Sequence, residues 1–275
     1  MELGDFPKNL KPGEFMGGEE TDEKFEYSKE KIELKPQVSE NLVKDFELFK
    51  EAFHPKADSI YYPCCGQDVS ISKAFPESDI VFLDMNHSVV EALRKEKHSA
   101  VEAPVEEYQL EKKADILLLL NPQVAPSKEI IDNLRDAGYV LCNNYHSTAT
   151  FFKNEKDFKI SGVIGMRGKS EPFLDTEKLS EYWEEIETDE ELKRAPFSWG
   201  GTNYKNVRDV VLGMTGKEEN LVEEYKKIRE QAKKDEEGSD GNPMVKDRNG
   251  EVHILADLPK KKGTADDIFV FQKIN

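Results

Sequence analysis

The chain has 275 residues, 35% of them charged, and a formal net charge of −17 at pH 7. This acidity disfavours duplex nucleic acid as a partner, because phosphate binding needs a basic surface. No apolar run approaches the ~20 residues of a membrane span, and the start, MELGDFPKNL, lacks the basic and apolar regions of a signal peptide. Three cysteines do not form a disulfide framework. We therefore expect a cytoplasmic protein, with no membrane contact, that acts on a small molecule or a protein.

The first 35 residues contain few apolar side chains and are expected to form a flexible acidic arm. A helix is predicted from Ser39, a good N-cap, to Phe53. Apolar side chains recur there at spacings of three and four residues, at Leu42, Val43, Phe46, Phe49 and Phe53.

Between residues 58 and 166, short apolar runs alternate with amphipathic segments. This alternation predicts βαβ units and a Rossmann-like α/β fold, a mostly parallel sheet with flanking helices. Strands are expected at 59–62, 80–83, 100–103, 116–120, 139–142 and 158–164, and helices at 69–75, 88–97, 127–136 and 148–154.

A helical insertion is expected at residues 168–250. One helical face is predicted from the apolar side chains of 179–186 and another from those of 221–232, with loops at 198–206 and 236–251. Two late strands, 252–256 and 268–272, follow. The Rossmann-like domain is thus expected to comprise residues 36–167 together with 251–275.

Polar residues follow the predicted parallel strands, and in such sheets ligands bind beyond the carboxyl ends of the strands. Strand one runs into the turn Pro63-Cys-Cys-Gly-Gln-Asp68, strand two ends at Asp84 and strand three at Glu102. A carboxylate in the position of Asp84 can accept hydrogen bonds from both hydroxyls of a ribose, and Glu102 could accept one from an adenine amino group. Alternatively, Asp84 starts a turn or caps the next helix, and Glu102 is simply solvated.

The runs IYYPCCGQD, FLDMN, VEA, ADILLLLNP and AGYVLCNNY occur in the order and spacing of one family. Residues 57–165 resemble the class I S-adenosylmethionine-dependent methyltransferases, and DIFVFQKI resembles the antiparallel last strand of their fold. The resemblance implies S-adenosylmethionine as cofactor. It also implies Gly66 as the central glycine of the glycine-rich motif I, Asp84 as the ribose-binding acid and Glu102 as the adenine-contacting acid.

Motif I departs from the family pattern at three positions. Tyr62 stands where the family has an acid, Cys64 replaces the first glycine and Asp68 the last. Side chains there narrow the space in which cofactor and backbone approach each other, although Asp68 could become a partner for the cofactor's ammonium group. The departures leave open a non-catalytic binding or scaffold protein of the same fold.

Catalytic residues are expected beyond strands four and five, at Asn121, Tyr145 and His146. Asn121-Pro122 is similar to the start of the Asn-Pro-Pro-aromatic motif of amino-group methylating members, although Gln123 and Val124 replace its second half. Tyr145 or His146 could deprotonate or orient a nucleophile. Alternatively, His146 caps the helix that follows.

Other residues have simpler interpretations. The pair Cys64-Cys65 lacks zinc-ligand spacing, so no metal site is expected. The aromatic residues Trp183, Trp199 and Tyr204 line a pocket or belong to the core, and residues 260–262, all lysine, are expected in a solvated loop. A nicotinamide-dependent oxidoreductase also places an acid after its second strand, but its fingerprint is richer in glycine than CCGQD.

Overall fold

The computed structural model describes residues 34–122, 124–167, 171–195, 204–235, 243–264 and 266–274. The arm expected at 1–35 therefore lies almost wholly outside the described residues, as do Gln123 and Trp199. Within the described ranges, no helix has the length and apolar character needed to cross a membrane.

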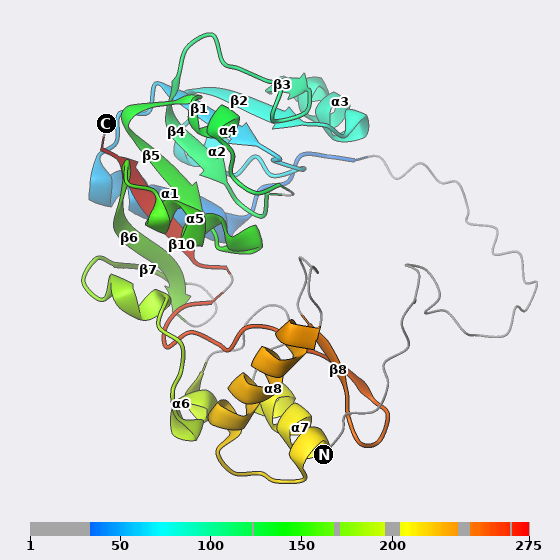
Figure 1. Cartoon of the computed structure of the whole chain (residues 1–275). Coiled ribbons are helices and arrows are strands. Elements are labelled where there is room, and N and C mark those ends of the chain that lie inside the picture. Colours follow the sequence, from blue (N-terminus) through cyan, green and yellow to red (C-terminus); the bar gives the residue numbers. More distant parts are fainter. Residues whose placement is uncertain are drawn as a thin grey trace, which may run out of the picture. The chain divides into compact units, whose positions relative to one another are not determined.

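Eight strands form one sheet in the order β3-β2-β1-β4-β5-β10-β6-β7 (Figure 1). The strands β1 to β5 run parallel, β10 is antiparallel to both β5 and β6, and β7 is antiparallel to β6. Their bounds are β1 Ser59–Pro63, β2 Asp79–Asp84, β3 Ser99–Glu102, β4 Ala114–Leu119, β5 Leu134–Cys142, β6 Phe158–Arg167, β7 Glu171–Asp175 and β10 Ile268–Lys273. The predicted Rossmann-like fold, mostly parallel with an antiparallel last strand, is confirmed.

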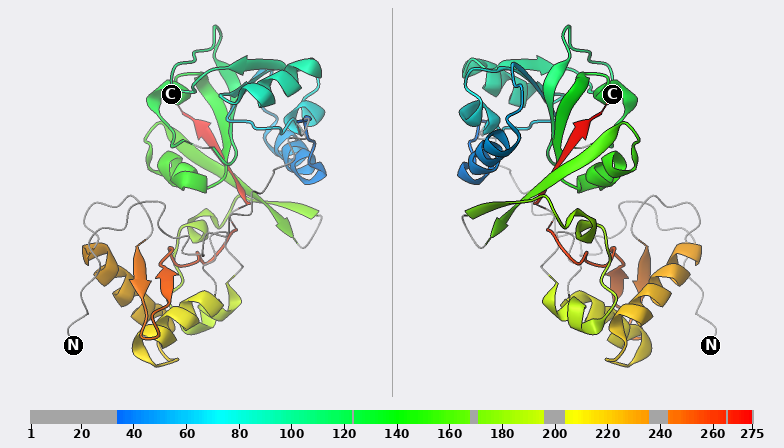
Figure 2. Two further views of the ribbon diagram at one scale, coloured as in Figure 1. Left: turned by 90° about the vertical axis from the view of Figure 1, so that its right-hand side faces the viewer. Right: turned by 90° about the vertical axis from the view of Figure 1, so that its left-hand side faces the viewer.

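Helices cover both faces of this sheet. Alternate residues of β4 enter different cores, with Ile116 and Leu118 on one face and Leu117 and Leu119 on the other, because successive side chains of a strand point to opposite sides. The first face also receives Phe46 and other side chains of α1 (Glu40–Phe53), α2 (Ile71–Ala74) and α3 (His87–Lys95). The second face packs against α4 (Lys128–Ile131) and α5 (Thr148–Asn154). Figure 2 shows α1 and α5 on opposite sides of the sheet.

Helix α1 begins where the sequence predicts. Ser39 is its N-cap, with Oγ accepting a hydrogen bond from the Leu42 backbone N–H at 3.4 Å. The helix expected at 127–136 is wrong in extent, since it ends at Ile131 and β5 begins at Leu134. The cause is Asn133, a buried residue whose side chain binds the backbones of Tyr108, Leu110 and Glu129 and so fixes the chain in an irregular turn.

A third hydrophobic core lies among α6 (Asp189–Arg194), α7 (Tyr204–Thr215), α8 (Leu221–Asp235) and the two-stranded sheet of β8 (Met244–Lys246) and β9 (Val252–Ile254). Helix α8 agrees with the prediction for 221–232. The loops expected at 198–206 and 236–251 are only partly loops, because α7 begins at Tyr204 and β8 lies within the second.

The prediction of one helix at 179–186 is wrong. Only the short 3₁₀ helix η2 (Leu179–Tyr182) forms there. Its apolar residues do not share one face, since Tyr182 and Trp183 belong to the core of the large sheet whereas Ile186 belongs to the third core. A single regular helix with one apolar face cannot place side chains in both of these cores.

Candidate functional site

The carboxyl ends of β1, β2 and β3 bring Gly66, Asp84 and Glu102 together. The Gly66 backbone N–H donates to Asp84 Oδ2 at 3.0 Å, and the Asn86 N–H donates to Asp84 Oδ1 at 2.8 Å. Asp84 lies directly opposite Glu102 in the β2–β3 register. The strand-end pattern in the sequence thus corresponds to a real juxtaposition of two carboxylates and a glycine backbone.

The loop after β1 leaves the space beside Gly66 open. Gly66 has φ +55°, and a Cβ built on it would meet no other atom within 4 Å. Cys64, which replaces the family's first glycine, also has a left-handed backbone, with φ +53°. The loop therefore adopts a conformation that glycine favours at Cys64, although the residue carries a side chain.

Tyr62 and Asp68, two of the motif I departures, bind each other. The buried Tyr62 hydroxyl donates to Asp68 Oδ2 at 3.0 Å, while Asp68 Oδ1 accepts from the Ser70 N–H at 3.0 Å and from the Ser70 hydroxyl. Burial first, and the negative charge of Asp68 second, hold the pKa of Tyr62 well above its ordinary value. Asp68 therefore fixes the loop, and both of its oxygens already accept hydrogen bonds from the protein.

The segment preceding α1 also holds this loop. The Gln37 N–H donates to the Gln67 carbonyl at 2.7 Å, and the Val69 N–H donates back to the Gln37 carbonyl at 2.9 Å. The Ser39 N–H donates to Ser70 Oγ at 2.8 Å. The loop is thus fixed from two sides, by β2 through Asp84 and by residues 37–39.

Glu102 has a histidine partner that the sequence did not suggest. Its Oε2 lies 2.7 Å from Nδ1 of His87, the first residue of α3, and both side chains are exposed. The hydrogen bond to Glu102 raises the pKa of His87. The two residues face solvent beside Asp84, where Glu102 is accessible to a ligand.

One buried asparagine, Asn143, joins the ends of β4 and β5. The buried Asn143 accepts from the Asn121 N–H at 3.1 Å and from the Tyr145 N–H at 3.3 Å through Oδ1, and its Nδ2 donates to Asn121 Oδ1 at 2.5 Å. Asn121 is exposed and has φ +49°, a backbone conformation that asparagine tolerates. Asn143 thus brings together two of the predicted residues, and its position directly after β5 was the available signal. His146 lies in the 3₁₀ helix η1 (Tyr145–Ser147), with its side chain outside the described part.

Two of the three cysteines near this edge, Cys65 and Cys142, are unsuited to nucleophilic roles. Cys64, Cys65 and Cys142 form no disulfide, and burial raises the pKa of Cys65 and of Cys142 well above the ordinary value. A thiol with a raised pKa stays protonated at neutral pH, whereas the thiolate is the nucleophile.

The remaining residues singled out in the sequence have structural contacts. Trp183 packs against Phe269 with ring centroids 5.1 Å apart, and Tyr204 packs against the third core. The lysines 260–262 each form ion pairs with acidic side chains, among them Lys260 with Glu185 at 3.4 Å. Although burial opposes it, hydrogen bonding to Lys262 helps lower the pKa of Asp175 to about 2.

The accessible groups of this edge match a ligand rich in hydroxyl and amino donors. Asp84 and Glu102 offer carboxylate oxygens, and each such oxygen can accept more than one hydrogen bond. Gly66 lets a ligand approach the backbone closely. A ribose with an attached base presents this combination of donors and flat surface, so the residues present fit a nucleoside.

Comparison with known proteins gives structural likeness only. No protein-family model matches the sequence, and no curated protein does. Among solved structures, the plantazolicin methyltransferase BpumL in complex with SAH is 16% identical, with 37% of this chain and 46% of that chain covered and a TM-score of 0.30. The N-methyltransferase NodS from Bradyrhizobium japonicum WM9 in complex with S-adenosylhomocysteine is 11% identical. The match covers 46% of this chain and 79% of NodS, with a TM-score of 0.36. DesVI from Streptomyces venezuelae is 15% identical, and the match covers 46% of this chain and 61% of DesVI, with a TM-score of 0.31.

The chain spans less than half of the first of these proteins. The class of fold follows from the sheet itself. An all-parallel dinucleotide-binding sheet has the order 3-2-1-4-5-6, whereas here the antiparallel β10 lies between β5 and β6. The antiparallel β10 agrees with the last strand that the sequence resemblance implies, and the strand order differs from that of the dinucleotide-binding sheet expected for the nicotinamide-dependent alternative.

Proposed function

We propose that the chain binds S-adenosylmethionine at the carboxyl ends of β1, β2 and β3 and transfers its methyl group to a small-molecule or protein acceptor. One observation carries this proposal. Asp84 accepts a hydrogen bond from the Gly66 N–H at 3.0 Å beside an open glycine face, in a sheet whose β10 is antiparallel.

Each residue has a distinct part in holding the cofactor. Asp84 would accept hydrogen bonds from the ribose hydroxyls while it fixes the loop, and Glu102 would accept one from the adenine amino group. Gly66 would keep the loop clear of the ligand. Asp68, expected to bind the ammonium group, is instead proposed to shape the loop, because its two oxygens accept three hydrogen bonds from Tyr62 and Ser70, whereas each oxygen of Asp84 accepts one. When bound, the cofactor supplies a methyl group activated by a sulfonium centre.

The acceptor is proposed to bind next to β4 and β5. Asn143 fixes Asn121 and the Tyr145 backbone there, so the exposed Asn121 can orient a nucleophile. Tyr145 and His146 are the proposed candidates for removing a proton from it. Catalysis of this type is mainly positioning, and a base is needed only when the nucleophile carries a proton at neutral pH.

A non-catalytic binding protein of the same fold is the second candidate. The Tyr62–Asp68 hydrogen bond favours it, because the side chains at the two ends of motif I bind each other rather than facing a ligand. Such a protein would bind the nucleoside without transferring a methyl group.

Calorimetric titration of the full chain with S-adenosylmethionine, S-adenosylhomocysteine and NAD tests the proposal. Binding of the first two and not of NAD is expected. Asp84→Asn should weaken binding at least about tenfold, because the loss of one charged hydrogen bond costs roughly 1.5–3 kcal/mol. Asp79→Asn is the matched control, since Asp79 is an exposed acid at the opposite end of β2.

Two outcomes would refute the proposal. One is no binding of either adenosyl compound at millimolar concentration. The other is equal affinity of the Asp84→Asn and Asp79→Asn variants. Transfer of a labelled methyl group to candidate acceptors then separates the enzyme from the non-catalytic candidate.

A further inference from the structure

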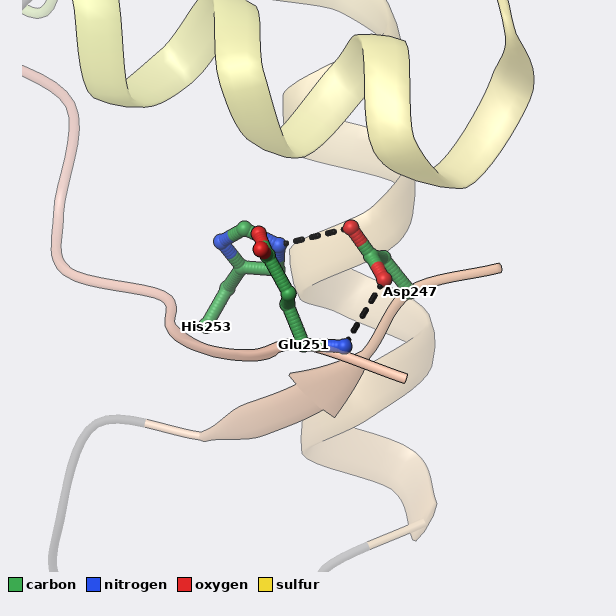
Figure 3. Close-up of side chains that lie close together, drawn as sticks. All are labelled: Asp247, Glu251 and His253. Atoms are coloured by element: carbon green, nitrogen blue, oxygen red, sulfur yellow. Dashed lines mark hydrogen bonds and ion pairs between the residues drawn. The ribbon is translucent and has the colours of Figure 1, made fainter. Parts of the chain in front are cut away.

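The hairpin of β8 and β9 brings three potential metal ligands together, as Figure 3 shows for Asp247, Glu251 and His253. One ligand atom from each lies within 4.8 Å of the others. The three residues belong to neither the large sheet nor the cofactor edge.

The hairpin holds two of these side chains in place. Asp247 is buried, and its Oδ1 accepts from the Asn249 N–H at 2.8 Å and from the Glu251 N–H at 3.0 Å. Its Oδ2 lies 3.1 Å from His253 Nε2. Antiparallel pairing of Val245 with His253 fixes the histidine opposite the strand that leads into Asp247.

Glu251 adds a second carboxylate where the first is already buried. Its side chain is exposed, and Figure 3 shows its carboxylate beside the His253 ring, in keeping with the 4.8 Å limit on the distances between the ligand atoms. Among the described residues, no lysine or arginine forms an ion pair with Asp247 or Glu251, although Arg248 lines the same cavity. His253 is therefore the partner of Asp247 in this cluster, and a bound cation would bring Glu251 into the same set of ligands.

A cavity of about 650 Å³ opens beside the three residues. Its walls include Asp209 and Gly213 of α7, Tyr225 of α8 and Ile254 of β9. Three protein ligands would leave coordination positions free, and these positions would face the cavity. A metal bound there could therefore receive water or a further ligand.

We propose that Asp247, Glu251 and His253 bind a divalent transition-metal cation. The imidazole favours zinc, manganese or ferrous iron over magnesium and calcium, which prefer oxygen ligands alone. To bind, His253 Nε2 presents its lone pair to the cation, with the ring proton on Nδ1. The Nε2 contact with Asp247 Oδ2 is then replaced by coordination of both atoms to one ion.

Titration of the chelator-treated full chain with zinc, manganese and magnesium chlorides tests this site. We expect one equivalent of zinc or manganese to bind, with magnesium at least about tenfold weaker. Glu251→Gln should weaken zinc and manganese binding at least about tenfold. Its exposed side chain makes this variant safe for folding, and the backbone N–H that binds Asp247 remains. Asp209→Asn is the matched control, an acid of the same cavity outside the ligand set.

Cobalt(II) absorption gives a readout that does not depend on enzyme activity. The wild-type chain and Asp209→Asn should give the same ligand-field bands, and His253→Gln should lose them. The proposal fails if neither zinc nor manganese binds at millimolar concentration. It also fails if Glu251→Gln and His253→Gln bind as the wild type does, because the cation would then occupy another place in the chain.

Discussion

The side-chain hydroxyls of two adjacent tyrosines of β1 differ in whether they form a hydrogen bond. Tyr62 donates to Asp68 at 3.0 Å, whereas the buried Tyr61 hydroxyl has no hydrogen-bond partner in the described part of the chain. A buried polar group without a partner costs free energy, and one that is paired stabilises the fold modestly. The two residues therefore form a natural matched pair.

Tyr62→Phe should lower the free energy of unfolding by about 1–2 kcal/mol, because Asp68 loses a buried donor. Tyr61→Phe should leave it unchanged or raise it. Urea denaturation at pH 7 measures both values. Equal destabilisation of the two variants would contradict this account of the loop.

Asp45, on α1, is a buried carboxylate whose Oδ1 has no hydrogen-bond partner among the described atoms. Burial first, and the charge of Asp267 second, raise the pKa of Asp45 to about 6. Burial also raises the pKa of Asp267 to about 6. Near neutral pH the fold therefore carries two carboxylates that bind protons more tightly than in the unfolded chain.

The sign of the pH effect follows from these raised values. Protonated Asp45 contributes stability below the unfolded pKa, and this contribution is lost as pH rises through about 6. Asp45→Asn cannot ionise, so its unfolding free energy relative to wild type should increase by about 1–3 kcal/mol between pH 4 and pH 8. Glu47→Gln, an exposed change on the same helix, is the control. A pH-independent difference for Asp45→Asn would contradict the assignment.

At the scale of elements, α7 and the β8–β9 hairpin meet at Gly213. A Cβ at this position would lie 2.5 Å from Asp247 Oδ2, and the Arg248 N–H donates to the Gly213 carbonyl at 3.4 Å. Glycine is a poor helix residue, so its place in α7 reflects the close approach of the hairpin. The carboxylate cannot move freely, because three hydrogen bonds hold it.

Gly213→Ala should therefore destabilise the chain, although alanine alone would favour the helix by about 1 kcal/mol. The expected net loss is about 1–3 kcal/mol, typical of overpacking. Thermal unfolding measures it, with Asp209→Ala on the same helix as the control for helix propensity. An increase in stability for Gly213→Ala would show that the hairpin shifts to accommodate the added methyl group.

The elements that the sequence predicts well are those with a strong local signal. The strand β4 is predicted from its uninterrupted apolar run, and the start of α1 from the N-cap Ser39. Neither prediction depends on which elements lie next to these segments in the fold. Strand β7 was not predicted, because its side chains are mostly half-buried and it contains Pro172. Its position depends on pairing with β6, which no local pattern encodes.

Some features of the candidate site are likewise predictable from the sequence, and others are not. Asp84 and Gly66 follow strand ends, so their approach could be expected from topology alone. The bonds of Asn143 to Asn121 and of Tyr62 to Asp68 depend on which side chains face each other after folding. The spacing of Asp247, Glu251 and His253 likewise becomes a cluster only when residues 248–250 form the hairpin turn.

At the scale of the whole molecule, the net charge of −17 opposes compaction. Adding salt shortens the screening length from ~30 Å at 0.01 M to ~8 Å at 0.15 M. The melting temperature should therefore rise by a few degrees as sodium chloride increases over this range. Potassium chloride with a chelator present is the control for specific cation binding. A falling melting temperature would indicate that attractive ion pairs outweigh the repulsion.

Strand β10 has a consequence for the order of assembly. It pairs with β5 and β6 on its two sides, yet residues 143–267 separate it from β5 in the chain. Until it arrives, β5 and β6 each present an unpaired edge, and such edges are templates for association with other chains. During synthesis the position between β5 and β6 stays open for as long as these intervening residues take to emerge. The nascent protein is thus vulnerable to aggregation at two edges, of β5 and β6, that lie inside the finished sheet.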